Sequence, residues 1–142
     1  MTDGAPAAVV VLAAGEGKRM KSERAKVLHA MCGRSLIEHV LVATEPLGAG
    51  RTLVVVGHQR EQVIAHLETL EVKATPVVQK EQNGTGHAVR VALDSAGGLD
   101  AGTVLILAGD APLITTETLR RLLARHVEIG AAATLLTAEV AD

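Results

Sequence analysis

Runs of apolar residues alternate along the chain with segments in which apolar positions recur at helical spacing. Residues 9–12 are Val, Val, Val and Leu, and a run that is apolar on both faces is typical of a strand buried between helices. Ser35 and Glu38 form a capping-box pattern, and apolar positions follow at helical spacing until Pro46. The chain is therefore expected to open with a central strand, and its first predicted helix covers residues 36–45.

The same alternation continues along the rest of the chain. Further strands are predicted at residues 53–56, 77–78, 104–107 and 133–136, and further helices at residues 61–70, 87–93 and 117–125. Strands separated by helical crossovers of this length pair in parallel, which predicts a doubly wound α/β sheet. Such sheets bind ligands at the carboxyl ends of their strands, so chemistry is expected in the loops after residues 12, 78 and 107.

Composition narrows the class of protein. A chain of 142 residues with 48% hydrophobic residues suits one globular domain. The formal net charge of −2 provides no basic field for nucleic acid, so an anionic ligand must be held by a local site. The apolar residues 5–14 follow Asp3 without a preceding Lys or Arg and are too short to span a bilayer, so no membrane role is expected. The single cysteine, Cys32, fits a reducing interior, and we expect a cytoplasmic protein.

The loop after the first predicted strand has features of a phosphate-binding loop. Gly15 and Gly17 allow the backbone to approach an anion closely, and Lys18 and Arg19 add positive charge. The loop is not a Walker A loop, and it is not a complete dinucleotide fingerprint, because Met20 stands at the third small position. On glycine spacing alone, an ordinary strand-to-helix turn is almost as good an interpretation.

Polar side chains elsewhere could join that loop. Lys26 could reach the same phosphates, although a solvated lysine is the more frequent outcome. Gln79 and Gln82 offer donors and acceptors suited to a pyrimidine edge, and the alternative is a polar turn before a helix. Asp110 follows a glycine at the end of a predicted strand and is our candidate ligand for Mg²⁺, with an ordinary Asp-led turn as the alternative.

Four motifs, taken together, resemble one enzyme family. They are LAAGEGKRM at residues 12–20, KVLH at 26–29, QNGTGHA at 82–88 and GDAPL at 109–113. Their combination resembles the bifunctional N-acetylglucosamine-1-phosphate uridyltransferase/glucosamine-1-phosphate acetyltransferase family over nearly the whole chain. The first motif alone would mark only the broad nucleotidyltransferase superfamily.

The resemblance implies a Rossmann-like, three-layer nucleotidyltransferase fold with a mostly parallel sheet. It implies that the nucleotide is bound by Leu12, Ala13, Ala14, Gly15 and Lys26. It also implies that Arg19 and Lys26 are catalytic and contact the triphosphate. Gln79, Gly84 and Thr85 are implied to recognise the uridine, and Asp110 to bind Mg²⁺. The implied reaction is uridylyl transfer from UTP to N-acetylglucosamine 1-phosphate. Its products are pyrophosphate and UDP-N-acetylglucosamine, a precursor for peptidoglycan and the cell wall.

The sequence also departs from the family pattern. Lys18 stands where Thr or Ser is usual, Ala25 where Pro is usual and Ala108 where an aromatic is common, so the loop's shape and charge are expected to differ. The resemblance implies that the family's catalytic domain continues past a position like Asp142 and is followed by a β-helix acetyltransferase domain. Residues 1–142 are therefore expected to be the nucleotide-binding portion, truncated at the carboxyl end, and a trimer is expected of the full-length family member only.

Two other hypotheses stay open. One is a nucleotidyltransferase for another base or acceptor, such as a molybdenum-cofactor guanylyltransferase, against which Gln79 and the sequence Gly-Thr-Gly-His argue. The other is a nucleotide-binding fragment without catalytic activity. A truncated sheet is also expected to expose an edge or an apolar patch that favours aggregation.

Overall fold

A single parallel sheet lies at the centre of the protein. The computed structural model describes residues 4–17 and 20–139. The strands follow the order β5-β4-β1-β6, with β1 at Ala8–Ala13, β4 at Thr52–Val56, β5 at Thr75–Val78 and β6 at Val104–Ala108. β1 pairs in parallel with both β4 and β6, and β4 pairs in parallel with β5. This confirms the predicted central position of the first strand and the doubly wound sheet.

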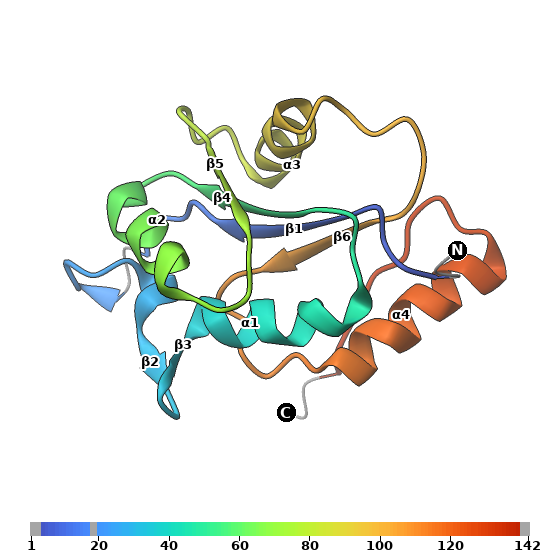
Figure 1. The fold of residues 1–142 in the computed structure, drawn as a ribbon, viewed down its shortest axis with the longest axis horizontal. Helices are drawn as coiled ribbons and strands as arrows, with labels where there is room; N and C mark the ends of the chain where they lie inside the picture. Colours follow the sequence, from blue (N-terminus) through green and yellow to red (C-terminus); the bar gives the residue numbers. More distant parts are fainter. Residues whose placement is uncertain (1–3, 18–19, 140–142) are drawn as a thin grey trace.

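Helices cover both faces of this sheet, which makes three layers (Figure 1). They are α1 at Leu36–Thr44, α2 at Arg60–Thr69, α3 at Thr85–Ser95 and α4 at Thr116–Ile129, with short 3-10 helices η2 at Lys26–Leu28 and η3 at Glu45–Leu47. Side chains of α1, α2 and α4 pack into one core cluster, and those of α3 pack into a second cluster on the opposite face. No helix in the described part of the chain is both long and apolar enough to cross a membrane.

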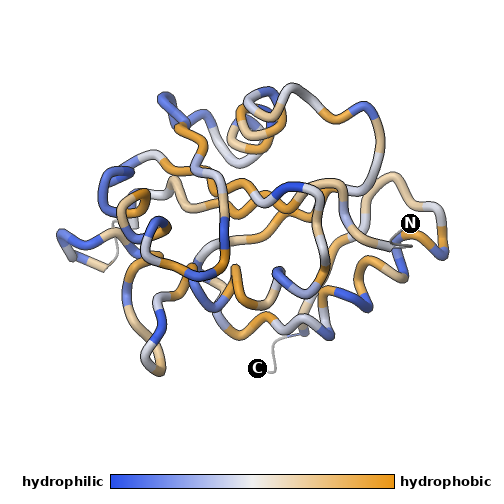
Figure 2. The backbone as a smooth tube through the Cα atoms, in the orientation of Figure 1, coloured by the Kyte–Doolittle hydropathy of each residue, from blue (hydrophilic) through white to orange (hydrophobic). Residues whose placement is uncertain are grey.

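The alternation of side chains along β1 explains why its sequence is apolar throughout. Val9 and Val11 belong to the cluster beneath α1 and α4, whereas Val10 belongs to the cluster beneath α3, and all three are fully buried. Successive strand residues point to opposite faces, so a strand covered on both sides must be apolar at every position. Figure 2 shows hydrophobic positions gathered along the strands and hydrophilic positions on outer helix faces and loops.

The expected strand at residues 133–136 is wrong. This segment forms no strand in the part of the chain that the structure describes, and Leu135 is 84% exposed. Its apolar pattern suited a strand, but a strand also needs a neighbour to satisfy its backbone groups, and the segment is not paired with the sheet. A contact of 2.9 Å between Thr134 Oγ1 and His126 Nδ1 instead holds it against α4.

Short elements and helix ends also differ from the prediction. A hairpin of β2, Ala30–Met31, and β3, Arg34–Ser35, was not predicted, because two residues are too few to show a period. α4 continues four residues beyond the predicted end and stops at Gly130, whose φ of 59° is left-handed.

Candidate active site

A cleft of about 480 Å³ opens where β1 and β6 end. Because all four strands are parallel, their carboxyl ends lie at one edge of the sheet, and the loops that follow them meet there. The cleft is lined by Leu12, Ala13, Gly15, Glu16, Gly17, Met20, Ala25, Lys26, Val27, Gln82 and Asp110. The predicted phosphate loop and the predicted metal ligand therefore share one cavity.

Lys26 and Asp110 meet in this cleft although they are 84 residues apart in sequence. Lys26 Nζ lies 2.5 Å from Asp110 Oδ2, and the two side chains are 40% and 35% exposed. Ion pairs this accessible to water contribute little to folding stability. The pair matters because it places a cation and a carboxylate, the two groups that handle phosphates and divalent metals, side by side in a cavity.

The phosphate loop packs directly on the stem of Lys26. Gly17 has a left-handed φ of 57°, and a Cβ added to it would lie 3.0 Å from Lys26 Cβ. Lys26 itself begins η2 between Ala25 and Val27, which are both buried. The lysine backbone is thus anchored in the core while its side chain extends along the loop into the cleft.

Asp110 reaches the cleft through a close approach of β6 to β1. The Gly109 N–H donates to Leu12 O at 2.9 Å. A Cβ on Gly109 would lie 3.0 Å from that oxygen and 3.2 Å from Val27 Cγ1. A side chain at position 109 would therefore crowd β1 and Val27 immediately before the aspartate.

Gln79 is buried and bonded within its own loop. Its Nε2 donates to Gly84 O at 3.3 Å and lies 3.0 Å from His87 Nδ1. Gly84 and Thr85 are exposed at the amino end of α3. None of these three residues is among the described residues that line the cleft. The residues predicted to recognise the uridine therefore lie outside this cavity.

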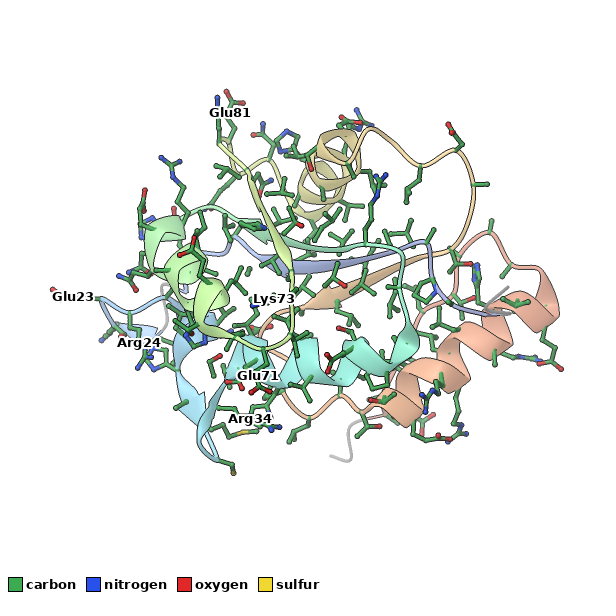
Figure 3. All side chains as sticks on the ribbon, in the orientation of Figure 1. Glu23, Arg24, Arg34, Glu71, Lys73 and Glu81 are labelled. Atoms are coloured by element: carbon green, nitrogen blue, oxygen red, sulfur yellow. The ribbon has the colours of Figure 1, made fainter. Side chains whose placement is uncertain are left out.

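Gln82 enters the cleft from the same loop. Its Nε2 donates to Ala14 O at 2.8 Å and so joins the loop after β5 to the loop after β1. Figure 3 shows Glu81, its neighbour, at the outer tip of this loop. From its amide in a glycine-rich loop, Gln82 was expected together with Gln79 to suit a pyrimidine edge, but the family resemblance assigned it no role.

The remaining predicted site residues line the cleft, lie next to it, or are outside the described residues. Leu12, Ala13 and Gly15 line the cleft, and Ala14 is buried behind it with its carbonyl bonded to Gln82. Arg19, the other predicted catalytic residue, lies outside the described residues. The sequence did not single out Glu16, which lines the cleft beside the two glycines.

Comparison with known proteins defines the class. Residues 9–140 match the family model of the MobA-like NTP transferase domain, and the chain belongs to this family. A solved nucleotidyl transferase from Methanothermobacter is 25% identical, with a TM-score of 0.68, over 82% of this chain and 56% of that one. A Mycobacterium tuberculosis protein solved in complex with manganese is 24% identical, with a TM-score of 0.65, over 88% of this chain and 59% of that one. The Rossmann-like nucleotidyltransferase fold is thereby confirmed.

Within this class, the chain is similar to the bifunctional protein GlmU. It is 58% identical to GlmU of Streptomyces avermitilis over 96% of this chain and 28% of that protein. It is 52% identical to GlmU of Thermobifida fusca over 100% of this chain and 30% of that protein. The chain thus spans less than a third of the length of these curated relatives. The resemblance carried by the four sequence motifs is confirmed.

Proposed function

We propose that this chain supplies the nucleotide-binding part of a uridylyl transfer from UTP to N-acetylglucosamine 1-phosphate. The observation that carries the proposal is the meeting of the glycine loop, Lys26 and Asp110 in one cleft at the carboxyl edge of the sheet. The similarity to bifunctional GlmU proteins supports the same reaction. We propose a cytoplasmic setting, and a trimer for the full-length relatives only.

The reaction needs positive charge more than it needs a nucleophile from the protein. An oxygen of the sugar phosphate attacks the α-phosphorus of UTP, a new O–P bond forms, and the bond to the bridging oxygen breaks as pyrophosphate leaves. Negative charge grows on the equatorial oxygens and on the pyrophosphate, and fixed cations offset it. No general base is needed, because a phosphate monoester is already anionic near neutral pH. Lys26 is the described cation in the cleft for this role, and Arg19 is proposed to join it.

Asp110 is the proposed protein ligand for Mg²⁺. Within the described residues, no group of three His, Cys, Asp or Glu side chains is placed to hold a metal. A single carboxylate still fits Mg²⁺, which is commonly held by one or two carboxylates together with waters and substrate phosphates. When bound, the ion would supply charge neutralisation at the phosphates. Because Lys26 Nζ lies beside Asp110 Oδ2, a triphosphate bound by the lysine would lie close to this carboxylate.

Base recognition is proposed for the loop after β5. Gln79 keeps this loop in shape through Gly84 O and His87 Nδ1, and Gly84 and Thr85 present backbone groups at the start of α3. The chain contains no Phe, Trp or Tyr, so the groups that this chain itself can offer to the base are amide and backbone hydrogen-bonding groups and not stacking aromatic rings.

Calorimetric titration tests this proposal. UTP is expected to bind more tightly than ATP, GTP or CTP in the presence of Mg²⁺. Asp110→Ala removes a charged ligand and is expected to weaken UTP binding by about 10- to 100-fold. Gln79→Ala loosens the loop and is expected to reduce the preference for UTP over CTP and GTP. Asp100→Ala changes an exposed aspartate that is not among the described residues lining the cleft; it is the matched control and should bind as the unchanged chain does.

The titration also separates the alternatives. Tightest binding of GTP would favour a nucleotidyltransferase for another base. Equal binding of all four nucleotides would support the phosphate-binding site and contradict the proposed recognition of uridine. Absence of binding by any nucleotide would overturn the proposed role of this chain.

A further inference from the structure

The segment that leads into Lys26 has little packing of its own. Residues 20–24 are all exposed. Figure 3 shows Glu23 and Arg24 at the outer end of this loop, with Glu23 pointing away from the body of the protein. Ala25, directly before the lysine, is buried, so the exposed stretch is confined to residues 20–24, and hydrogen bonds are what tie this stretch to the rest of the protein.

The side chain of Gln62 supplies two of these hydrogen bonds. The Ala25 N–H donates to Gln62 Oε1 at 3.1 Å, and Gln62 Nε2 donates to Glu23 O at 3.1 Å. One amide thus serves an acceptor and a donor of the same short segment, as the peptide group of a neighbouring strand would. The reversed orientation of the amide would satisfy neither bond, so the network assigns its oxygen and nitrogen. Gln59 Nε2 also donates to Glu23 O.

Both glutamines lie at the start of a helix that is fixed to the core. Gln59 precedes the first residue of α2, and Gln62 lies in its first turn. The next residue, Val63, is fully buried, and Leu67 one turn later is buried as well. α2 follows β4, so its first turn has a defined position relative to the sheet edge where the cleft opens. The glutamines thereby connect a rigid element to an exposed loop 36 to 39 residues away in sequence.

From this geometry we infer that Gln62 is a positioning residue for Lys26. Ala25, held by Gln62 Oε1, directly precedes the lysine whose Nζ reaches Asp110. Gln62 is not among the described residues that line the cleft, so its effect on a ligand passes through the lysine. Without its two hydrogen bonds the segment samples more conformations, and a triphosphate must then order it at the expense of binding affinity. This inference rests on the proposed phosphate-binding function of Lys26.

Gln62→Met tests the inference, because methionine keeps the length and the helix propensity of glutamine and removes both hydrogen bonds. UTP affinity in Mg²⁺ is expected to fall about tenfold, the loss that two neutral hydrogen bonds give together. Gln62→Glu keeps the acceptor for the Ala25 N–H and loses the donor to Glu23 O, and its expected loss is about threefold. Glu68→Met, on an exposed position of the same helix, is the matched control and should leave the affinity unchanged.

A double-mutant cycle with Lys26→Met distinguishes positioning from general support of the fold. If Gln62 acts through the lysine, Gln62→Met should change UTP affinity by less than about twofold once Lys26 is already methionine. An equal loss in both backgrounds would overturn the inference, and so would an unchanged affinity of Gln62→Met when Lys26→Met alone is weakened. Failure of the unchanged chain to bind UTP would instead overturn the proposed function itself, and the role of Gln62 with it.

Discussion

Asp110 depends for its position on the residue before it. The Gly109 N–H bonds to Leu12 O at the end of β1, and the space that a side chain would fill is already occupied by that oxygen and by Val27 Cγ1. β1 is held on both sides by β4 and β6, so it cannot move away to make room. Because Gly109 has no side chain, β6 can approach β1 closely enough to place the Asp110 carboxylate next to Lys26.

Gly109→Ala is expected to lower the free energy of unfolding by about 1–3 kcal/mol, the usual range for overpacking a filled interior. Gly86→Ala is the control, because Gly86 lies in α3 and an added Cβ there would meet no described atom within 4 Å outside its chain neighbours and the backbone of its own helix. The control should be neutral or up to about 1 kcal/mol more stable, since alanine favours helix. Urea unfolding of both variants measures the difference, and an unchanged midpoint for Gly109→Ala would show that β6 can shift freely.

Two helices begin at side-chain caps, and the two caps are not equivalent. Ser35 Oγ accepts from Glu38 N at 3.2 Å at the start of α1, as the capping-box pattern predicted. Thr115 Oγ1 accepts from Thr118 N at 3.2 Å at the start of α4. Ser35 is buried and also lies 2.7 Å from His66 Nε2 on α2, so it joins two helices as well as starting one.

Ser35→Ala is therefore expected to cost more than Thr115→Ala. Loss of the exposed cap at Thr115 should lower the free energy of unfolding by about 1 kcal/mol. Loss of Ser35 should cost about 2–3 kcal/mol, because it removes a cap and leaves His66 Nε2 without this partner. Chemical unfolding of the two variants side by side measures the difference, and equal costs would mean that the contact between Ser35 and His66 contributes nothing.

On the scale of the whole molecule, the sheet ends in an unevenly covered strand. β6 is the last strand of the described sheet beyond β1, and its Ile106 is 48% exposed. α3 packs over β1, β4 and β5, whereas Leu105 on the opposite face of β6 is buried in the cluster that contains α4. An apolar side chain on an open edge strand is a common starting point for association between chains.

The chain is accordingly expected to self-associate, and Ile106→Lys is expected to reduce that association. A charged residue on an edge strand disfavours pairing with another strand. Val127→Lys is the control, because Val127 is 59% exposed but lies on α4 and not on the sheet. Sedimentation over a range of concentrations measures both variants. A chain that stays monomeric throughout, or an equal effect of the two lysines, would show that the edge is not the cause.

Local sequence patterns predict much of this architecture. Buried parallel strands require apolar runs, amphipathic helices require apolar residues at helical spacing, and Ser35 starts α1 through a bond three residues away. The four strands of the sheet and the glycine loop after β1 were therefore predictable, and the rule that ligands bind at carboxyl strand ends located the cleft.

Tertiary structure decided the features that depend on distant partners. Residues 133–136 have the composition of a strand but no paired neighbour, and Gln82 and Gln62 act through backbone groups of Ala14, Glu23 and Ala25. A hydrogen bond between residues 37 positions apart produces no repeating pattern of apolar or polar residues in either of the two segments that it joins. The sequence alone thus determined which elements form and which loops carry charge. Only the packed sheet decided which of those side chains meet, because contacts between distant segments exist only after the chain has folded.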